Sequence, residues 1–131
     1  MPTITGAHHM ALTVSDVERS ATWYAALLDM TVVLAGGDDS VSFKVLAHPG
    51  SGWLMGVREY RDGSGDRFDE FRTGLDHLAF AVPDRPELDA WEAELARRSI
   101  AYTPVKETPI GSVLVFRDPD GIQLEFWLPS I

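Results

Sequence analysis

The sequence predicts an α+β fold of two tandem βαβββ modules whose strands form a concave, partly closed mixed sheet. Two observations predict it: the chain repeats itself, and each repeat runs from an apolar strand-like segment through a helical segment to three further strand-like segments. At 131 residues the chain also has the size of a single domain. A sheet with one helix on one face leaves its other face uncovered. The modules are therefore expected to pair around a shared concave surface that holds the ligand site.

The internal repeat relates residues 5–27 to residues 73–95. The segments TGAHHMALTVSDVERSATWYAAL and TGLDHLAFAVPDRPELDAWEAEL align without a gap at an offset of 73 − 5 = 68 residues. Nine of the 23 aligned positions are identical, whereas chance supplies roughly one or two. The repeat predicts two copies of one structural module, at about residues 1–62 and 73–131, within a single domain of residues 1–131.

The first module is expected to begin with a strand at residues 9–14 (HMALTV), followed by Ser15 and Asp16, which favour a turn and a helix start. A helix follows, because apolar residues recur at helical spacing, namely Val17, Ala21, Tyr24 and Leu28. The sequences GGDD and HPGSG are typical of turns. They separate three strands, which we expect at residues 31–35, 41–47 and 53–60.

The second module has the same order of elements. Its first strand is expected at residues 77–82 (HLAFAV), and its helix is indicated by the spacing of Leu88, Trp91 and Leu95. The turns ETPIG and DPDG separate three strands expected at residues 101–106, 112–117 and 123–128. The segment RDGSGDRFDEFRT, at about residues 61–73, is polar and contains glycine. It is expected to be a linker and is a candidate gate over a site.

Composition excludes several classes of function. Acidic residues outnumber basic ones by 20 to 11, and the resulting formal charge of −9 argues against nucleic acid and anionic membrane surfaces as partners. There is no cysteine, so a metal would have to bind nitrogen and oxygen. No segment has the length of a membrane span or the pattern of a signal peptide, so a cytoplasmic location is expected.

His9 and His77 occupy equivalent positions in the two copies of the repeat. Side chains alternate between the faces of a strand, so both histidines are expected on the face opposite the apolar core residues. The small residues Ala11 and Ala79 share that face and leave space. His8 is a rival candidate, but it aligns with Asp76 whereas His9 aligns with His77, which favours His9.

Glu125 is the only charged residue in the apolar segment GIQLEFWL. A carboxylate buried alone is destabilising unless it is paired or coordinates a cation. Two histidines and one carboxylate on adjoining strands form a facial ligand set that leaves metal positions open for substrate or water. His9, His77 and Glu125 are therefore predicted to hold a divalent metal. The structural alternative is two hydrogen-bonded histidines and an ion-paired glutamate.

Five further residues are candidates for substrate binding. Arg58 is expected on the ligand face if Met55 and Val57 face the core, where it could pair with an anionic group. It could equally be an exposed basic residue at the end of a strand. Aromatic walls could come from Trp53, Tyr60, Phe116 and Trp127, although aromatic residues in so small a domain are more often part of the core.

The segments GAHHMALTVSD, GLDHLAFAV and FRDPDGIQLEFW resemble the vicinal oxygen chelate superfamily, the glyoxalase/bleomycin resistance protein/dioxygenase type. The resemblance covers essentially the whole chain and implies a glyoxalase/bleomycin resistance/dihydroxybiphenyl dioxygenase-like fold. It places the metal-ligand positions on His9, His77 and Glu125. It also implies a homodimer in which His9 of one subunit meets His77 and Glu125 of the other.

The chain departs from particular members of that superfamily. The fourth ligand of glyoxalase I would fall on Met55 or Gly56, neither of which can serve. Fosfomycin-resistance enzymes carry a threonine where this chain has Ala11. Extradiol dioxygenases, which share the ligand set, are commonly longer, and bleomycin-resistance proteins generally lack the ligands.

The function expected from the resemblance is that of a small metal-dependent enzyme, a lyase or dioxygenase, acting on a small oxygen-chelating substrate. The metal is expected to be Fe, Mn, Ni, Co or Zn. Any proton transfer would fall to Glu125 itself or to a metal-bound hydroxide, since no separate base is evident. The alternative is a dimeric, bleomycin-resistance-like protein that sequesters an antibiotic without catalysis.

Overall fold

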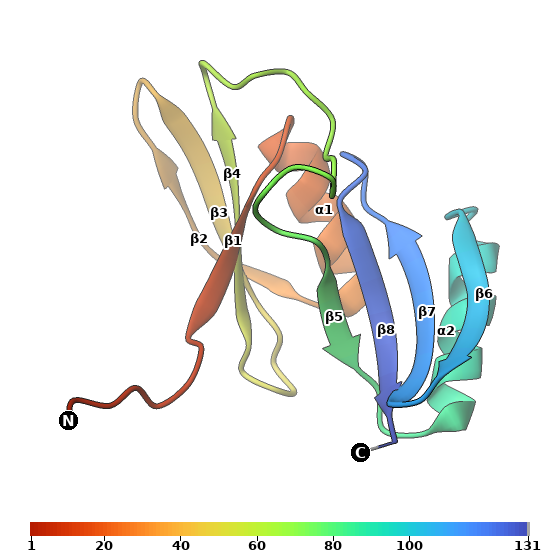
Figure 1. Cartoon of the computed structure of the whole chain (residues 1–131). Helices are drawn as coiled ribbons and strands as arrows, with labels where there is room; N and C mark the ends of the chain where they lie inside the picture. Colours follow the sequence, from red (N-terminus) through yellow and green to blue (C-terminus); the bar gives the residue numbers. More distant parts are fainter. Residues whose placement is uncertain (131) are drawn as a thin grey trace. The chain divides into compact units, whose positions relative to one another are not determined.

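The structure is a computed structural model that describes residues 1–130, and it divides into two compact units, Met1–Asp66 and a second unit that begins at Arg67. Each unit contains one βαβββ module (Figure 1). The elements of the first unit are β1 (His9–Thr13), α1 (Val17–Leu28), β2 (Thr31–Gly37), β3 (Val41–Ala47) and β4 (Leu54–Tyr60). Those of the second are β5 (Leu78–Ala81), α2 (Arg85–Arg97), β6 (Tyr102–Thr108), β7 (Gly111–Arg117) and β8 (Gln123–Pro129).

Both helices begin at an aspartate that the repeat places at equivalent positions. Asp16 accepts a hydrogen bond from the Arg19 amide at 3.0 Å, and Asp84 accepts one from the Glu87 amide at 2.9 Å. These side chains satisfy amide groups that have no partner within the helix. Asp29 ends α1 in the left-handed conformation, with a φ of 53°.

The two sheets have the same topology. Their strand orders are β1-β4-β3-β2 and β5-β8-β7-β6. The pairs β1/β4 and β5/β8 are parallel, whereas the other neighbours are antiparallel, so each sheet is mixed. The predicted α+β fold of two βαβββ modules is confirmed. The strands form two open four-stranded sheets, each with two edges, and not one continuous sheet.

In each unit the helix packs against one face of the sheet and leaves the other face open. Helix α1 contacts β3 and β4, and α2 contacts β6 and β8. The helix-covered faces hold the core, including Tyr24, Met55 and Val57 in the first unit and Leu88, Leu124 and Phe126 in the second. Side chains at the intervening strand positions lie on the open face. His9 and Glu125 are among them, as the alternation predicts.

The observed elements differ from the expected ones mainly at their ends. In α1 the buried residue of the last turn is Leu27, and Leu28 is only partly buried. Strands β2 and β6 extend to Gly37 and Thr108, beyond the expected ends, and each contains a register shift. No helix within residues 1–130 is both long and apolar enough to cross a membrane.

Candidate metal centre

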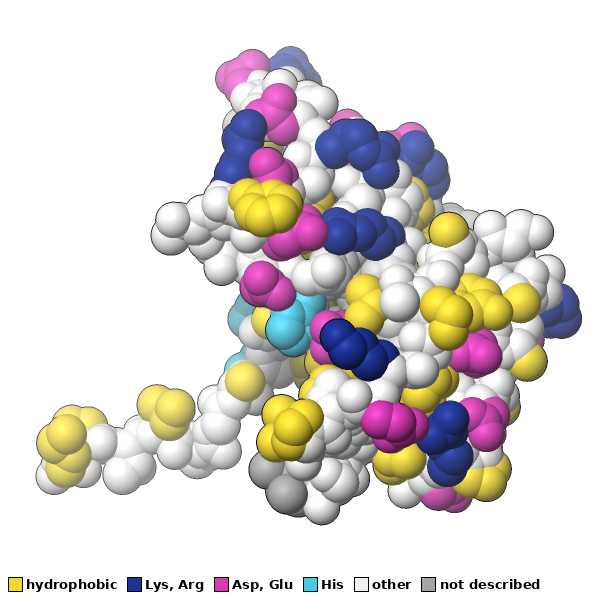
Figure 2. Space-filling model, turned by 45° about the vertical axis from the view of Figure 1, so that its right-hand side comes forward, with side chains coloured by type: hydrophobic (Ala, Val, Ile, Leu, Met, Phe, Trp, Pro, Cys, Tyr) yellow, Lys and Arg dark blue, Asp and Glu magenta, His cyan; other side chains and the backbone are white. Residues whose placement is uncertain are grey.

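Two of the three predicted ligands lie together in the second unit. The Nε2 atom of His77 is 3.5 Å from an Oε2 oxygen of Glu125. His77 immediately precedes β5, and Glu125 lies in β8 beside Ala79, which is its partner in the parallel register. The small Ala79 side chain leaves the two polar groups facing each other. The His77 side chain is 41% exposed, so the pair is open to a ligand. Figure 2 shows histidine side chains reaching the molecular surface.

Glu125 is a mostly buried carboxylate, with a side chain only 13% exposed. Burial raises its pKa above the ordinary value of 4.5; His77 acts in the opposite direction, and the negative charge of Asp76 adds to the increase. A cation bound at Glu125 would compensate for the lost hydration of the ionised form.

The donor atoms of His77 and Glu125 fit a divalent metal. Nitrogen and carboxylate ligands bind such metals at roughly 2.0–2.2 Å. Two donors about 2.1 Å from one ion and 3.5 Å from each other subtend roughly 110° at that ion. This angle is compatible with a single ion between them, which would need further ligands from elsewhere.

The remaining predicted ligand, His9, lies on the open face of the first unit. It is the first residue of β1, and its Nδ1 atom is 2.8 Å from Nδ1 of His8. The hydrogen bond uses one nitrogen of each ring and leaves Nε2 of His9 for a ligand. Within residues 1–130 the structure contains no group of three or more histidine, aspartate or glutamate side chains arranged to hold a metal.

Arg58 faces the same side of the first sheet as His9. Its β1 partner is Thr13, and Met55 and Val57 of the same strand are completely buried on the other face. The Arg58 guanidinium lies over the rings of Phe43 and Tyr60, at 5.2 and 5.7 Å from their centroids. Its Nε also donates to the Tyr60 hydroxyl at 3.2 Å. These contacts hold the Arg58 guanidinium against the aromatic rings of Phe43 and Tyr60.

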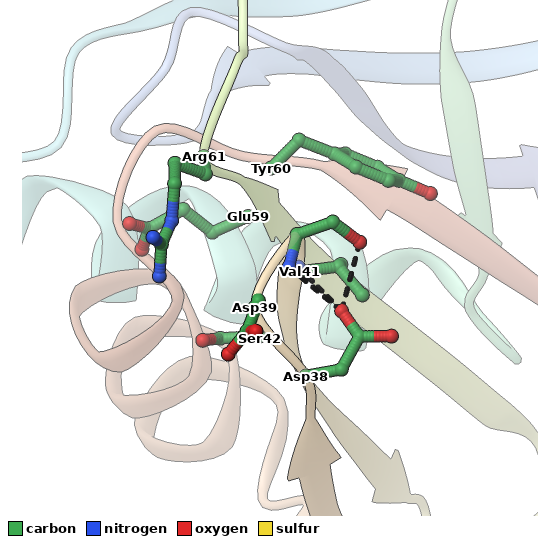
Figure 3. A pocket seen from close by; sticks show the side chains of 8 residues that line it. Asp38, Asp39, Val41, Ser42, Glu59, Tyr60 and Arg61 are labelled. Atoms are coloured by element: carbon green, nitrogen blue, oxygen red, sulfur yellow. Dashed lines mark hydrogen bonds between the residues drawn. The ribbon is translucent and has the colours of Figure 1, made fainter.

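Tyr60 also lines a hollow of about 300 Å³ where β3 begins and β4 ends (Figure 3). The hollow contains Asp38, Asp39 and Glu59 but none of the predicted metal ligands. Two of its carboxylates, those of Asp38 and Glu59, accept hydrogen bonds from the main chain. Asp38 accepts from the Ser40 amide at 2.7 Å, and Glu59 accepts from the Val17 amide at the start of α1 at 2.8 Å.

The other aromatic candidates lie in different environments. Trp127 is partly exposed on the open face of the second sheet, in register with Ala81. Trp53 is half-buried just before β4. The expectation for Phe116 needs correction, because its side chain is 1% exposed and its ring stacks on Phe126 at 4.9 Å. Phe116 belongs to the core on the face opposite Glu125.

The two copies of the repeat carry different residues at the position of Glu125. Ala11 pairs with Gly56 in the first unit as Ala79 pairs with Glu125 in the second. The amides of Val14 and Val82 likewise bond to the carbonyls of equivalent residues in β4 and β8. Gly56, and not Met55, is thus the counterpart of Glu125. The first unit therefore supplies a histidine but no carboxylate at this place.

Sequence reasoning missed two polar residues beside His77. Asp76 Oδ1 lies 2.6 Å from His77 Nδ1, and the Gln123 amide donates to Asp76. The alignment of Asp76 with His8 was a usable signal, because both precede a ligand candidate and both contact its Nδ1 atom.

Comparisons with known proteins agree with this architecture. A sequence model of the Glyoxalase/Bleomycin resistance protein/Dioxygenase superfamily matches residues 6–126. The crystal structure of a glyoxylase/bleomycin resistance protein/dioxygenase domain from Frankia sp. EAN1pec is 42% identical, with a TM-score of 0.89, and the match covers 97% of this chain and 99% of that chain. The uncharacterized protein YwkD of Bacillus subtilis is 27% identical over 123 residues, which are 92% of this chain and 94% of that protein.

A more distant structure shares the fold. It is a mutant of the fosfomycin resistance protein FosX from Listeria monocytogenes, complexed with Mn(II) and dihydroxypropylphosphonic acid. The identity is 18% and the TM-score 0.73, with coverage of 95% of this chain and 90% of that chain.

Proposed function

The chain belongs to the Glyoxalase/Bleomycin resistance protein/Dioxygenase superfamily, and on this premise we propose that it is a metal-dependent enzyme acting on a small oxygen-chelating substrate. His9, His77 and Glu125 are the proposed ligands, and the reaction is of the lyase or dioxygenase type. The observation that carries the proposal is the 3.5 Å approach of His77 Nε2 to the buried carboxylate of Glu125.

A divalent metal bound by these residues would polarise the oxygens of a chelating substrate and stabilise negative charge that develops on them. The protein's own groups set the conditions for that chemistry. His77 presents Nε2, because its Nδ1 is engaged by Asp76. Glu125 sits where burial raises its pKa, so a bound cation would compensate for the hydration that the ionised carboxylate has lost.

The donor set indicates which metals are candidates. Two imidazole nitrogens and one carboxylate suit Fe, Mn, Ni, Co or Zn, and geometry and supply select among them. The FosX complex contains Mn(II) in a protein of the same fold. Mn(II) is therefore the first ion to use in reconstitution.

We propose a homodimer as the working assembly. His9 belongs to the first unit, and His77 and Glu125 belong to the second. Each unit has a sheet face that its own helix does not cover. Pairing a first unit with a second unit from the partner would bring a histidine to a histidine and a carboxylate, and two-fold symmetry would create two such sites.

The test is to count metal per chain after reconstitution with Mn(II), Fe(II), Ni(II), Co(II) or Zn(II) and dialysis. We expect about one ion per wild-type chain and none in the His77→Ala, Glu125→Ala double variant. The matched control is His48→Ala with Glu87→Ala, which removes a histidine from a turn and an exposed glutamate from the first turn of α2. This control should retain its metal.

Failure of the wild type to bind any of the five ions would overturn the proposal. Antibiotic sequestration without catalysis would then be the reading to test, by calorimetry with a cationic antibiotic. Metal binding that survives the loss of both His77 and Glu125 would equally contradict the proposed site.

A further inference from the structure

The His77 ring is held by a carboxylate that is not a proposed metal ligand. Asp76 Oδ1 lies 2.6 Å from His77 Nδ1, on the side of the ring away from Glu125. A carboxylate accepts hydrogen bonds, so the ring nitrogen that faces it carries the proton. Nε2 of the neutral ring then has the lone pair, and this is the atom that faces Glu125. The contact selects the tautomer in which Nε2, and not Nδ1, presents its lone pair to a cation.

Asp76 is itself fixed by Gln123. The Gln123 Nε2 group is 3.2 Å from both the Oδ1 oxygen and the main-chain carbonyl of Asp76. Gln123 lies two residues before Glu125 on the same face of β8. The strand that carries the carboxylate ligand therefore also carries the support for the histidine ligand.

The orientation of the Gln123 amide is set by Arg117. The Arg117 Nη2 atom is 3.4 Å from Gln123 Oε1. The other end of the amide, Gln123 Nε2, therefore points at Asp76. Arg117 also donates to the Gly121 carbonyl at 2.9 Å and forms a two-point contact with Glu70, at 2.8 and 3.1 Å. The guanidinium lowers the pKa of Glu70 to about 2. The pair therefore stays ionised at neutral pH.

We propose that Asp76, held by Gln123, is a positioning residue that fixes the His77 ring with Nε2 presented to Glu125. This inference rests on the proposed metal centre, since it assigns a role relative to that centre. The order of contacts, from Glu70 through Arg117, Gln123 and Asp76 to His77, ties the segment before β5 to the ligand. Glu70 lies in the predicted linker, and its contact with Arg117 joins this part of the linker to β7.

The equivalent position of the first unit holds a different partner. His8 aligns with Asp76 and contacts Nδ1 of His9 at 2.8 Å. A neutral histidine can accept this hydrogen bond, but unlike the Asp76 carboxylate it has no negative charge. The two ligand histidines are thus supported unequally, and His77 has the stronger partner.

The experiment compares Asp76→Ala and Asp76→Asn with the wild type in two measurements. The first is Mn(II) affinity, followed by the electron paramagnetic resonance of free Mn(II). The second is the tautomer of His77 in the metal-free protein, from long-range ¹H–¹⁵N spectra. The Asn variant keeps an oxygen that accepts from both His77 and Gln123, so it is the conservative rescue. Asp62→Ala, in the exposed turn after β4, controls for the loss of one negative charge.

We expect the wild type to show the Nδ1–H tautomer and Asp76→Ala to lose it, with Mn(II) affinity reduced roughly 10- to 100-fold. Asp76→Asn should keep the tautomer and lose less affinity. Asp62→Ala should match the wild type. Gln123→Ala provides a second variant that leaves Asp76 in place, and it should shift the tautomer partly. A thermal melt of each variant identifies any that fail to fold.

Two results overturn the inference. Wild-type affinity in Asp76→Ala would show that Asp76 does not position the ligand, while the metal centre itself would stand. If the wild type binds no Mn(II), the metal measurement tests only the proposed function, and the spectra decide the role of Asp76. An unchanged His77 tautomer in Asp76→Ala would then reject the positioning role, and its loss would support it.

Discussion

At the scale of single residues, the duplicated positions show how one module became chemically different from the other. Gly56 and Glu125 occupy the same place, each beside an alanine of the adjoining parallel strand. A Cβ atom added at Gly56 would lie 3.3 Å from the Ala11 Cβ, so the first sheet has little room there for a larger side chain. The carboxylate and the space for it are thus confined to the second module.

Gly111, the first residue of β7, is required by the backbone. Its φ is +154°, and a Cβ atom there would lie 2.3 Å from the Leu128 carbonyl oxygen. We expect Gly111→Ala to lower the free energy of unfolding by about 2–4 kcal/mol, measured by urea denaturation, because the strand must move or strain. Gly65→Ala is the control. Gly65 has a φ of +75° with open space around it, so only the backbone cost of about 1 kcal/mol is expected. Equal losses in the two variants would contradict the steric explanation.

The sequence predicted the sheet face of a candidate site residue where the pattern of its own strand was sufficient to assign that face. The repeat identified His9 and His77, and alternation within β8 placed Glu125 opposite the core. The position of Phe116 was wrong because its face depends on the register of β7 with β8, in which it pairs with Leu124. A slip of one residue reverses the face, and sequence alone did not fix the register. Gln123 was missed because its contact with Asp76 joins residues that are 47 positions apart in the sequence.

At the scale of elements, helix boundaries were predictable because aspartates at 16 and 84 cap both helices. The ends of the edge strands β2 and β6 were less predictable from the sequence. In β6 the register shifts between Thr103 and Lys106, around Pro104, which has no amide proton to donate. In β2 a similar shift follows Val32, where no proline is present. Such irregularities depend on the pairing partner and leave no uniform mark in the sequence.

The end of α2 carries a pH-sensitive group. Glu94 accepts hydrogen bonds from Arg97 and from Arg98, the latter at 2.7 Å, and these bonds lower its pKa from 4.5 to about 2. A carboxyl whose pKa is lower in the folded state stabilises that state above the unfolded pKa. This contribution is lost as the pH falls through the folded value.

Glu94→Gln should therefore lower the melting temperature at pH 7, and the difference from the wild type should shrink as the pH falls from about 4.5 to about 2. Melting curves followed by circular dichroism across this range provide the measurement. Because the Glu94 side chain is 30% exposed, the shift in melting temperature is expected to be small and reduced by salt. The control is Asp62→Asn, which removes one negative charge from an exposed turn. A difference that is constant from pH 7 to pH 2 would exclude Glu94 as its source.

At the scale of the whole molecule, the three proposed ligands are divided between two units, with His9 in one and His77 and Glu125 in the other. The repeat predicts this division, because it copied the histidine strand into each module. It does not predict whether a site is completed within one chain or between two chains. Metal binding by dimers that combine two different variant chains distinguishes the two possibilities.

Dimers can be assembled from one His9→Ala chain and one His77→Ala, Glu125→Ala chain that carry different affinity tags. If sites are shared between subunits, the first chain contributes intact His77 and Glu125, and the second contributes intact His9. One complete site then forms in each mixed dimer, and the other site lacks all three ligands. We expect about one metal ion per mixed dimer and none in dimers of either variant alone.

The control for this experiment is the mixed dimer of two differently tagged wild-type chains, which should bind two ions. If each site were completed within a single chain, every chain of the variant dimer would lack a ligand, and metal binding would stay absent. Failure to isolate any mixed dimer, even with wild-type chains, would contradict the homodimer itself. Recovery of one ion per mixed dimer requires ligands from both chains, because neither chain alone carries a complete set.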